Sequence, residues 1–509
     1  MENLTDIILI SPKNRKLGIF SSFLFKSVPI GIGVLASYLI KFGFSPEIID
    51  AEITVIDEKL IKQKLENMAL PKIFGISCMT TNIQKAYQIA KLIKKSDKDA
   101  IVIAGGIHPT VESEEVITSG HFDFVVRAEG EKALLSLINK LKANDKDYSD
   151  IKNLVYIGNN GEIITNEIDE ELIDVNELPS FPYHLFDSRL YDLGFTVSSR
   201  GCPFNCIFCS QRAITKGKYR WRKKEYVIEE LDFLINQSNQ KNIGFFDDCF
   251  TADKKRVFEL CSLIKERKLH EKCTFGAQTR GDTVNKELLE EMKTAGFTVL
   301  MFGFETSSDH LMKIINKGET VEDNINAVKI AKELGYNVMA TFIFGFPEET
   351  YEDRINALKI AKKIGIDIAR FNIAIPFPGT ELYRIAVEQN KLKKEDSWSN
   401  FNSVGVITSG LFEHYTIPYC PEGIKPVDLA AQVFLSNFLF YVNLKNLQEL
   451  LNFKNKDNGK WFNIPKEKML SPKIWFDFVV LFLTVAFKTI YFLTVSKEAR
   501  KFFIEGFKA

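Results

Sequence analysis

Three cysteines, Cys202, Cys206 and Cys209, stand at the spacing Cys-x3-Cys-x2-Cys. Iron–sulfur clusters are held by cysteine thiolates, and a cubane cluster most often takes four of them. Because no fourth cysteine belongs to this motif, one iron of such a cluster would keep an open position for an outside ligand. Structural zinc sites are the alternative, but they prefer four protein ligands, often in two Cys-x2-4-Cys pairs, and no second pair exists. The spacing therefore predicts a cubane cluster with one open iron.

The composition limits where such a site would work. The chain has 509 residues, and its 66 basic side chains equal its 66 acidic ones, so we expect two or three domains. The balanced charge and the lack of a basic run with aromatics give no sign of nucleic-acid binding. Eight cysteines, several of them isolated, indicate a reducing compartment. The first residues resemble no secretory signal, so we expect a cytoplasmic protein.

The first 145 residues alternate short apolar runs with helical patterns, and this alternation is typical of parallel sheets. The helical patterns are clearest at 29–42 and 82–95. The expected strands are Asp6–Ile10, Pro46–Ile49, Ile73–Cys78, Ala100–Ala104 and Phe122–Val126. We therefore predict a doubly wound, Rossmann-like α/β domain at 1–145, with its ligand at the carboxyl ends of the strands.

Two loops follow the last two of these strands. One begins with Gly105 and Gly106 and continues through His108, and the other contains Glu129 and Gly130. Paired glycines let a ligand approach the backbone closely. Followed by the three-cysteine motif, these loops resemble the cobalamin-binding domain of cobalamin-dependent radical S-adenosylmethionine (SAM) enzymes. The resemblance implies that these five residues contact cobalamin.

One departure concerns the lower face of cobalt. Many cobalamin proteins supply a histidine there from an Asp-x-His-x-x-Gly motif, and no histidine of this chain stands in one. Radical SAM relatives commonly lack that motif too, so we expect His108 to be a hydrogen-bonding group of the loop rather than an axial ligand. The alternative is a Rossmann-like domain that has lost its cofactor and serves as scaffold.

Residues 146–194 read as a linker with one hairpin, and residues 195–385 as a partial (β/α)6 barrel. The expected barrel strands begin near Phe195, Ile243, Cys273, Thr298, Val338 and Ala369. In such barrels the chemistry sits at the carboxyl ends of the strands. Cys249, Cys261 and Cys273 we interpret as core or loop thiols.

The barrel resembles the radical SAM fold, in which the methionine part of SAM chelates the open iron. The resemblance places SAM contacts at the strand ends, on Asp247, Arg280, Glu305, Ser307 and Gly345. It implies that Asp247 meets the ammonium of SAM and that Arg280 pairs with its carboxylate or sugar. For Asp248, the capping of the following helix is an equal alternative.

Residues 386–509 are predicted to be mainly helical. The stretch 475–495 is apolar but is interrupted by Asp477 and Lys488, and a lysine in mid-bilayer is costly. A buried helical subdomain, an interfacial membrane helix and a true span all remain open. Basic residues flank the stretch at Lys473, Lys497, Arg500 and Lys501, which suits peripheral contact with an anionic membrane.

The resemblance implies a [4Fe–4S] cluster, SAM and cobalamin as cofactors. The cluster would reduce SAM to methionine and a 5′-deoxyadenosyl radical, which removes hydrogen from a substrate carbon. Methylcobalamin would then give its methyl group, and a second SAM would restore it. We therefore predict a C-methyltransferase of a small hydrophobic or polycyclic substrate, served by an electron donor such as flavodoxin or ferredoxin. An oxidative ring cyclase of the type that acts on magnesium porphyrins, and a non-catalytic membrane-associated cobalamin sensor, are the alternatives.

Overall fold

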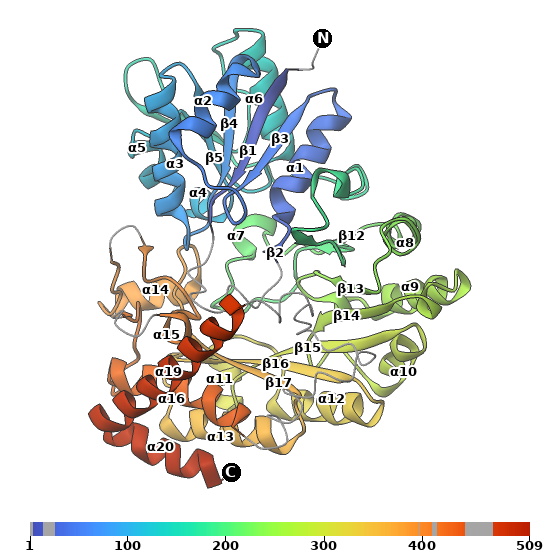
Figure 1. Ribbon diagram of the computed structural model, residues 1–509, viewed down its shortest axis with the longest axis vertical. Coiled ribbons are helices and arrows are strands. Elements are labelled where there is room, and N and C mark those ends of the chain that lie inside the picture. The colour runs from blue at the N-terminus through green and yellow to red at the C-terminus, as the bar shows by residue number, and fades with distance from the viewer. Residues whose placement is uncertain (1–3, 14–25, 396–397, 410–414, 443–471, 509) are drawn as a thin grey trace.

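Two parallel sheets dominate the computed structural model, which describes residues 4–13, 26–395, 398–409, 415–442 and 472–508. Figure 1 shows the first sheet, in blue, at one end of the molecule and the second, in green to orange, at the other. The short helix α7 (Arg212–Thr215) lies between them. The carboxyl ends of the two sets of strands face this middle region.

The first sheet is a doubly wound domain, as predicted. Its strand order is β3-β1-β4-β5-β6-β7-β8, and the first five strands in that order are parallel. These five are β1 (Thr5–Ser11), β3 (Pro46–Asp50), β4 (Met68–Ser77), β5 (Ile101–Gly105) and β6 (Phe124–Val126). The helices between them are α1 (Ile30–Lys41), α2 (Glu58–Glu66), α3 (Ile83–Ser96), α4 (Ile107–Val111) and α5 (Ser113–Thr118), and α6 (Glu131–Lys142) follows.

The segment predicted as a linker supplies two more strands to the first sheet. Strand β7 (Leu154–Ile157) pairs antiparallel with β6, and β8 (Ile163–Thr165) pairs with β7. Leu154 and Val155 are fully buried, so the hairpin covers core that β6 would otherwise leave exposed. The first sheet therefore extends past residue 145, and the crossing to the second sheet comes after the hairpin.

The second sheet is a six-stranded parallel half-barrel, as predicted. Its strands follow one another in chain order, so β10 and β17 form the two edges. They are β10 (Phe195–Thr196), β13 (Asn242–Phe245), β14 (Thr274–Thr279), β15 (Phe297–Glu305), β16 (Asn337–Phe344) and β17 (Ile368–Ile373). The covering helices are α8 (Lys224–Asp232), α9 (Lys254–Glu266), α10 (Lys286–Thr294), α11 (Asp309–Ile314), α12 (Val321–Glu333) and α13 (Tyr351–Lys363).

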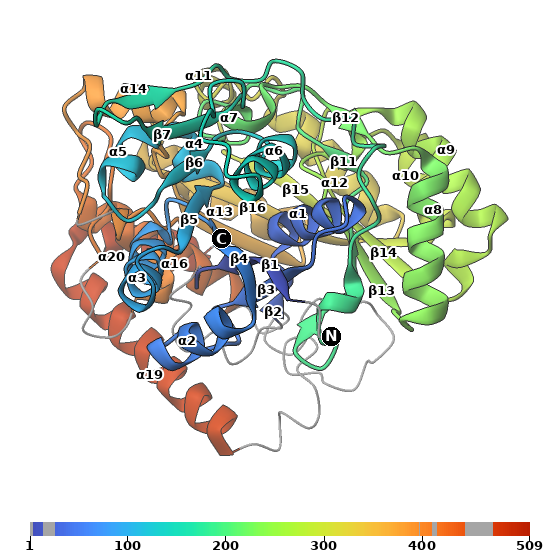
Figure 2. The same cartoon turned by 90° about the horizontal axis from the view of Figure 1, so that it is seen from above.

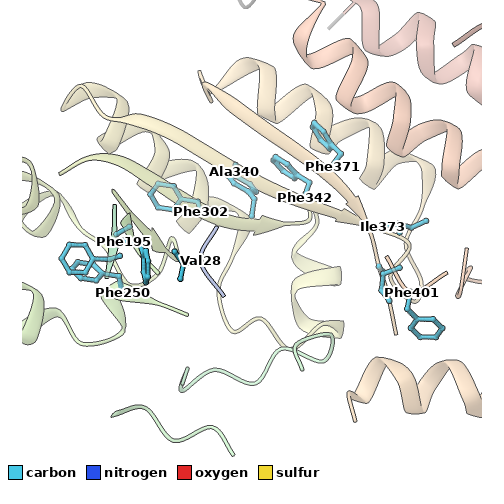
Figure 3. Close-up of a cluster of buried hydrophobic side chains, with 14 of the residues drawn as sticks. Val28, Phe195, Phe250, Phe302, Ala340, Phe342, Phe371, Ile373 and Phe401 are labelled. Atoms are coloured by element: carbon cyan, nitrogen blue, oxygen red, sulfur yellow. The ribbon is translucent and has the colours of Figure 1, made fainter. Parts of the chain in front are cut away.

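The edge strand β17 is closed off by a helix of the C-terminal region. Helix α16 (Pro426–Tyr441) places the Asn437 amide against β17, where it accepts from Phe371 N over 3.2 Å and donates to Phe371 O over 2.7 Å. The Tyr441 hydroxyl donates to Ala369 O over 2.9 Å. These side chains satisfy backbone groups that an open edge leaves unpaired. Figure 3 shows the core beneath, where the Phe342 and Phe371 rings stack with centroids 5.0 Å apart.

The C-terminal region is helical, as predicted. Besides α16, it contains α14 (Glu381–Glu388) and α15 (Gly405–Thr408), which precede α16, and α19 (Pro472–Val495) and α20 (Lys497–Lys508), which follow it. Helix α16 ends at Tyr441, and residues 443–471 lie outside the described part of the chain. Within the described residues, no helix is long and apolar enough to cross a membrane.

Candidate active site

A cavity of about 400 Å³ lies between the two sheets. The first domain contributes glycines to its wall, the crossing segment contributes apolar side chains, and the half-barrel contributes polar ones. The lining residues include Gly31, Gly75, Gly105, Gly106 and Gly130 from the first domain. They also include Val175, Leu178, Pro179 and Phe181 from the crossing segment, and Arg200, Gln211 and Asp248 from the half-barrel. The loops that were predicted to bind ligands on the two sheets therefore border one shared space.

Part of the wall on the first domain is glycine backbone. Gly106 has φ +105°, and a Cβ there would lie 2.7 Å from Cys78 O, so only glycine fits. A Cβ on Gly105 would find its nearest heavy atom, Val126 O, at 3.8 Å, and one on Gly31 would find none within 4 Å. Side chains at these two positions would fill the cavity. Such a cradle fits a large, flat cofactor that approaches the backbone, as cobalamin would.

His108 lies behind this wall and does not line the cavity. Its side chain is fully buried, with Nδ1 3.2 Å from Thr80 Oγ1 and its ring in edge contact with Trp398. Glu115 Oε1 is 3.8 Å from Nε2, which is too far for a hydrogen bond. The first turn of α4 thus directs the His108 ring toward Thr80 and Trp398, and a cofactor contact at His108 stays a prediction.

Glu129 lines the cavity and also joins the two domains. Its carboxylate accepts from Arg220 Nη1 over 3.0 Å and lies 3.5 Å from Arg200 Nη1. Glu131, at the start of α6, accepts from Arg200 Nη2 over 2.7 Å. Neither Arg200 nor Arg220 was predicted as a site residue from the sequence. The position of Arg200, two residues before Cys202, was the available signal.

The three cysteines share one loop between β11 (Ser199–Arg200) and α7, and each is partly exposed. Gly201 opens the loop at φ +85°, and a Cβ there would meet Lys218 O at 2.1 Å. Further along, Ile207 N donates to Ile315 O and Leu382 N donates to Ile207 O, both over 3.0 Å. The barrel therefore holds the loop from two sides.

Across the described ranges, no three side chains of His, Cys, Asp or Glu gather as ligands of a single metal ion would. A cubane needs a wider arrangement, because each thiolate binds a different iron atom. A loop with three partly exposed cysteines, pinned at both sides, fits that arrangement.

Arg280 braces this loop. Its guanidinium stacks on the Phe204 ring at 3.6 Å, pairs with both Asp282 oxygens over 2.9 Å, and donates to Lys317 O over 2.6 Å. Arg280 is nearly buried by these partners. The structure thus places Arg280 beside the cysteine loop, in contact with protein groups.

A buried ion-pair cluster stands next to Arg280, and sequence reasoning missed its central lysine. Lys317 Nζ lies 3.1 Å from Glu305 Oε1 and 3.6 Å from Glu319 Oε1. Burial lowers the pKa of Lys317, but these two carboxylates hold it above its ordinary value. Gly303 makes the pairing possible, because a Cβ there would lie 2.6 Å from Glu305 Oε1.

Both burial and these cations shift the pKa values of the cysteine thiols. Burial raises the pKa of Cys202, Cys206 and Cys209, and to about 11 for Cys209. Arg280 and Lys317 act in the opposite direction on Cys202 and Cys206, which favours their thiolates. The cations therefore supply part of the charge balance that thiolate ligands need.

Asp247 does not reach the cavity. Its side chain is fully buried, where Ser198 N donates to it over 2.7 Å and the Ser198 and Ser199 hydroxyls donate over 2.6 Å. These donors occupy the carboxylate, and the predicted contact of Asp247 with a ligand ammonium stays a prediction.

Its neighbour Asp248 lines the cavity instead. Asp248 Oδ2 accepts from Gly201 N over 3.2 Å and from Gln211 Nε2 over 2.6 Å. The helix α9 is capped by Asp253, whose carboxylate accepts from Arg256 N, so the capping alternative for Asp248 is also wrong. Asp248 is thus the carboxylate of this strand end that faces the shared space.

Ser307 and Gly345 lie away from the cavity, at the ends of β15 and β16. Ser307 Oγ donates to Asp353 O over 2.6 Å, which ties β15 to α13. Gly345 has φ +99°, and its N–H donates to Glu349 Oε2 over 2.6 Å. Both residues fix the loops that follow their strands.

Residues 196–379 match the Radical SAM superfamily, and residues 17–138 match the B12 binding domain. A protein of Pyrococcus horikoshii named as an uncharacterized methyltransferase is 34% identical over 76% of this chain and 84% of its own. The anaerobic magnesium-protoporphyrin IX monomethyl ester cyclase of Cereibacter sphaeroides is 28% identical over 70% of this chain and 60% of its own.

Among solved structures, the radical SAM methyltransferase TsrM of Kitasatospora setae, determined with cobalamin and a [4Fe–4S] cluster bound, has the same fold. It superposes with a TM-score of 0.69 at 17% identity, over 85% of this chain and 91% of that one.

Proposed function

Because this chain belongs to the radical SAM superfamily, in the group that carries a B12 binding domain, we propose that it is a cobalamin-dependent C-methyltransferase of a hydrophobic metabolite. The shared cavity carries this proposal. Gly105 and Gly106 from the first domain border the same space as Arg200 and Asp248 from the half-barrel. Cofactors held on the two walls would meet at a substrate between them.

The fit of the side chains supports a division of tasks between the walls. Cys202, Cys206 and Cys209 would hold a [4Fe–4S] cluster with SAM at its open iron, and the glycine cradle would hold cobalamin. When bound, these cofactors supply the radical and methyl-transfer chemistry, while the protein positions them and excludes water and oxygen.

The chain's own polar residues orient those cofactors. Asp248 presents a carboxylate to the cavity, where it suits the ammonium of SAM better than the enclosed Asp247 does. Arg280 orients the cysteine loop through its stack on Phe204, and Glu305 acts through Lys317. Ser307 and Gly345 position the strand-end loops. Glu129 and Gly130 complete the cradle on the side of the first domain.

The substrate that suits this site is small and apolar. Val175, Leu178, Pro179 and Phe181 from the crossing segment line the cavity, together with Phe195 and Phe246 from the half-barrel. Burial of apolar substrate surface against such side chains would supply binding energy. Each turnover needs electrons from outside, for which a flavodoxin or ferredoxin is the proposed donor.

Oxidative ring closure is the second candidate, and the relative from Cereibacter sphaeroides favours it, because that protein is a cyclase. The two reactions differ in the mass of the product. Methylation adds one carbon and two hydrogens to the substrate, whereas oxidative cyclisation adds no carbon.

The deciding experiment is anaerobic. The reconstituted protein is incubated with methylcobalamin, a reductant, a cell extract and SAM whose methyl group carries deuterium, and small molecules are followed by mass spectrometry. We expect a product with a deuterated methyl group, and one 5′-deoxyadenosine and one S-adenosylhomocysteine for each methyl transferred after the first turnover. A Cys206→Ala protein should give none. Deoxyadenosine formation with a product that lacks the label would favour the cyclase. Absence of deoxyadenosine in all extracts would favour the non-catalytic sensor.

A further inference from the structure

Helix α19 exposes an apolar face that the proposed function does not use. Its exposed large side chains are Phe476, Val479, Phe482, Leu483, Phe487, Ile490, Tyr491 and Val495. Three of them, Phe482, Leu483 and Ile490, are 73%, 58% and 65% exposed. Single exposed apolar residues are ordinary, but a continuous apolar face marks a site of interaction.

The opposite face of α19, which packs on the protein, is mixed: Val485 and Leu493 pack against the core beside polar side chains. Thr484, Lys488 and Phe492 are buried and recur every fourth residue, so they share one side of the helix, and the buried Ser496 directly follows the helix. Lys488 Nζ donates to Val406 O over 3.0 Å and to Ser409 O over 2.7 Å. A surface helix of a water-soluble protein normally has its apolar side inward and its polar side outward.

Between Val479 and Val495 the exposed face carries no charged side chain. Lys488 is the only charged residue in 478–495, and its ammonium points inward. Charges resume directly beyond the helix, where the basic Lys497, Arg500 and Lys501 are exposed together with the acidic Glu498. In the sequence, Lys473 stands at the other end. An apolar face between basic ends complements a lipid surface with anionic headgroups.

The position of α19 in the molecule suits such a surface. Figure 2 shows the helix running along the outside of the protein, with its N-terminal part projecting from the body. A projecting ridge of bulky side chains needs no matching groove if it enters a fluid phase. We propose that α19 docks this protein on an anionic lipid bilayer, lying along the interface with its apolar face at the acyl-chain boundary. This inference is independent of the methyltransferase proposal.

Vesicle flotation tests the inference on the purified full-length protein. We expect the protein to float with vesicles of phosphatidylcholine and phosphatidylglycerol, and to float less with phosphatidylcholine alone or at high salt. The triple variant Phe482→Ser, Leu483→Ser, Ile490→Ser should lower the partition coefficient by at least about tenfold, because three large apolar side chains no longer enter the lipid. Its melting temperature should change little, since the replaced side chains face outward.

A matched variant controls for general surface hydrophobicity. Val55→Ser, Leu190→Ser and Val387→Ser also replace exposed apolar residues, but on other parts of the surface, and should leave flotation unchanged. The inference is overturned if the unaltered protein stays unbound with both vesicle types, or if the α19 variant floats as well as the parent. A concentration-dependent dimer in lipid-free solution that the α19 variant abolishes would instead assign this face to a second copy of the chain.

Discussion

The guanidinium of Arg200 and the carboxylate of Glu131 meet over 2.7 Å, and this contact links the first domain to the residue next to the cysteine loop. Glu131 begins α6, directly after the loop that contains Glu129 and Gly130. Arg200 is the last residue of β11, two positions before Cys202. Together with the contacts of Glu129 with Arg200 and Arg220, this ion pair connects the two walls of the cavity.

Removal of the charge on Glu131 should loosen the cysteine loop. Glu131→Gln keeps the size of the side chain but weakens its bond to Arg200, and we expect a loss of about 1–2 kcal/mol in the free energy of unfolding. Amide hydrogen exchange over residues 196–212 should become faster. Asp187→Asn breaks a 2.6 Å pair whose partner Arg189 is 87% exposed, and it should change neither quantity. Unchanged exchange in Glu131→Gln would show that the pair does not order the loop.

Cys206 and Cys249 give a paired test of the open iron site. Reconstituted protein should carry about four iron and four sulfide per chain. Cys206→Ala should lose them, because two thiolates do not hold the cluster. Cys249 is buried in the segment that follows β13, and Cys249→Ala should keep full iron content. If Cys249→Ala also loses the cluster, a fourth cysteine is a ligand and the open position is misassigned.

Gly105 offers a cleaner test of the cradle than Gly106 does. A side chain on Gly106 would strike the Cys78 backbone, so its variants disturb the sheet as well as the ligand. Gly105→Val has local room and fills the cavity, so we expect cobalamin affinity to fall at least about tenfold with little change in melting temperature. His108→Ala should leave the spectrum of bound cob(II)alamin unchanged, because that ring lies behind the wall. A nitrogen coupling that disappears in His108→Ala would contradict this placement.

Pattern reasoning identified the elements well, because periodic burial and strand-end punctuation are local properties of the sequence. The sequence pattern does not decide which of two plausible neighbours a given side chain contacts. Asp247 and Asp248 are adjacent and chemically identical, and the difference between them depends on whether a serine pair or the cavity stands opposite. His108 was ambiguous for the same reason, since the turn of α4 decides which way the ring points. The role of Lys317 could not be predicted from the sequence, because its partners come from separate segments of the chain.

Lys317 should influence the electronic properties of the cluster through its fixed charge. Asn316 Nδ2 donates to Asn205 O over 3.0 Å, so the backbone beside Lys317 is tied to the cysteine loop. Lys317→Met removes a buried positive charge, and we expect the midpoint potential of the cluster to fall by tens of millivolts, since reduction adds negative charge nearby. Lys313→Met removes an exposed charge from the preceding helix and should leave the potential unchanged.

Lys317→Met also leaves the buried carboxylate of Glu305 without its ion-pair partner, which should lower the free energy of unfolding by about 3–5 kcal/mol. If that variant does not fold, Glu305→Gln alone gives the opposite test: it removes a buried negative charge beside Lys317 and should raise the potential. An unchanged potential in a folded protein would limit Lys317 to a structural role.

In a helix that spans a membrane, Lys488 would have to reach the lipid headgroups. In the structure, its side chain points toward the protein instead. Its ammonium holds two carbonyls at the end of α15, and Lys488→Met leaves them without that donor, so we expect a loss of about 1–3 kcal/mol in stability. Lys497→Met, at an exposed position, should cost less than about 0.5 kcal/mol. Because Lys488 faces the protein, its replacement should not increase vesicle flotation. Stronger flotation with unchanged stability would mean that this lysine faces the lipid, and that the inward orientation of the polar side of α19 is wrong.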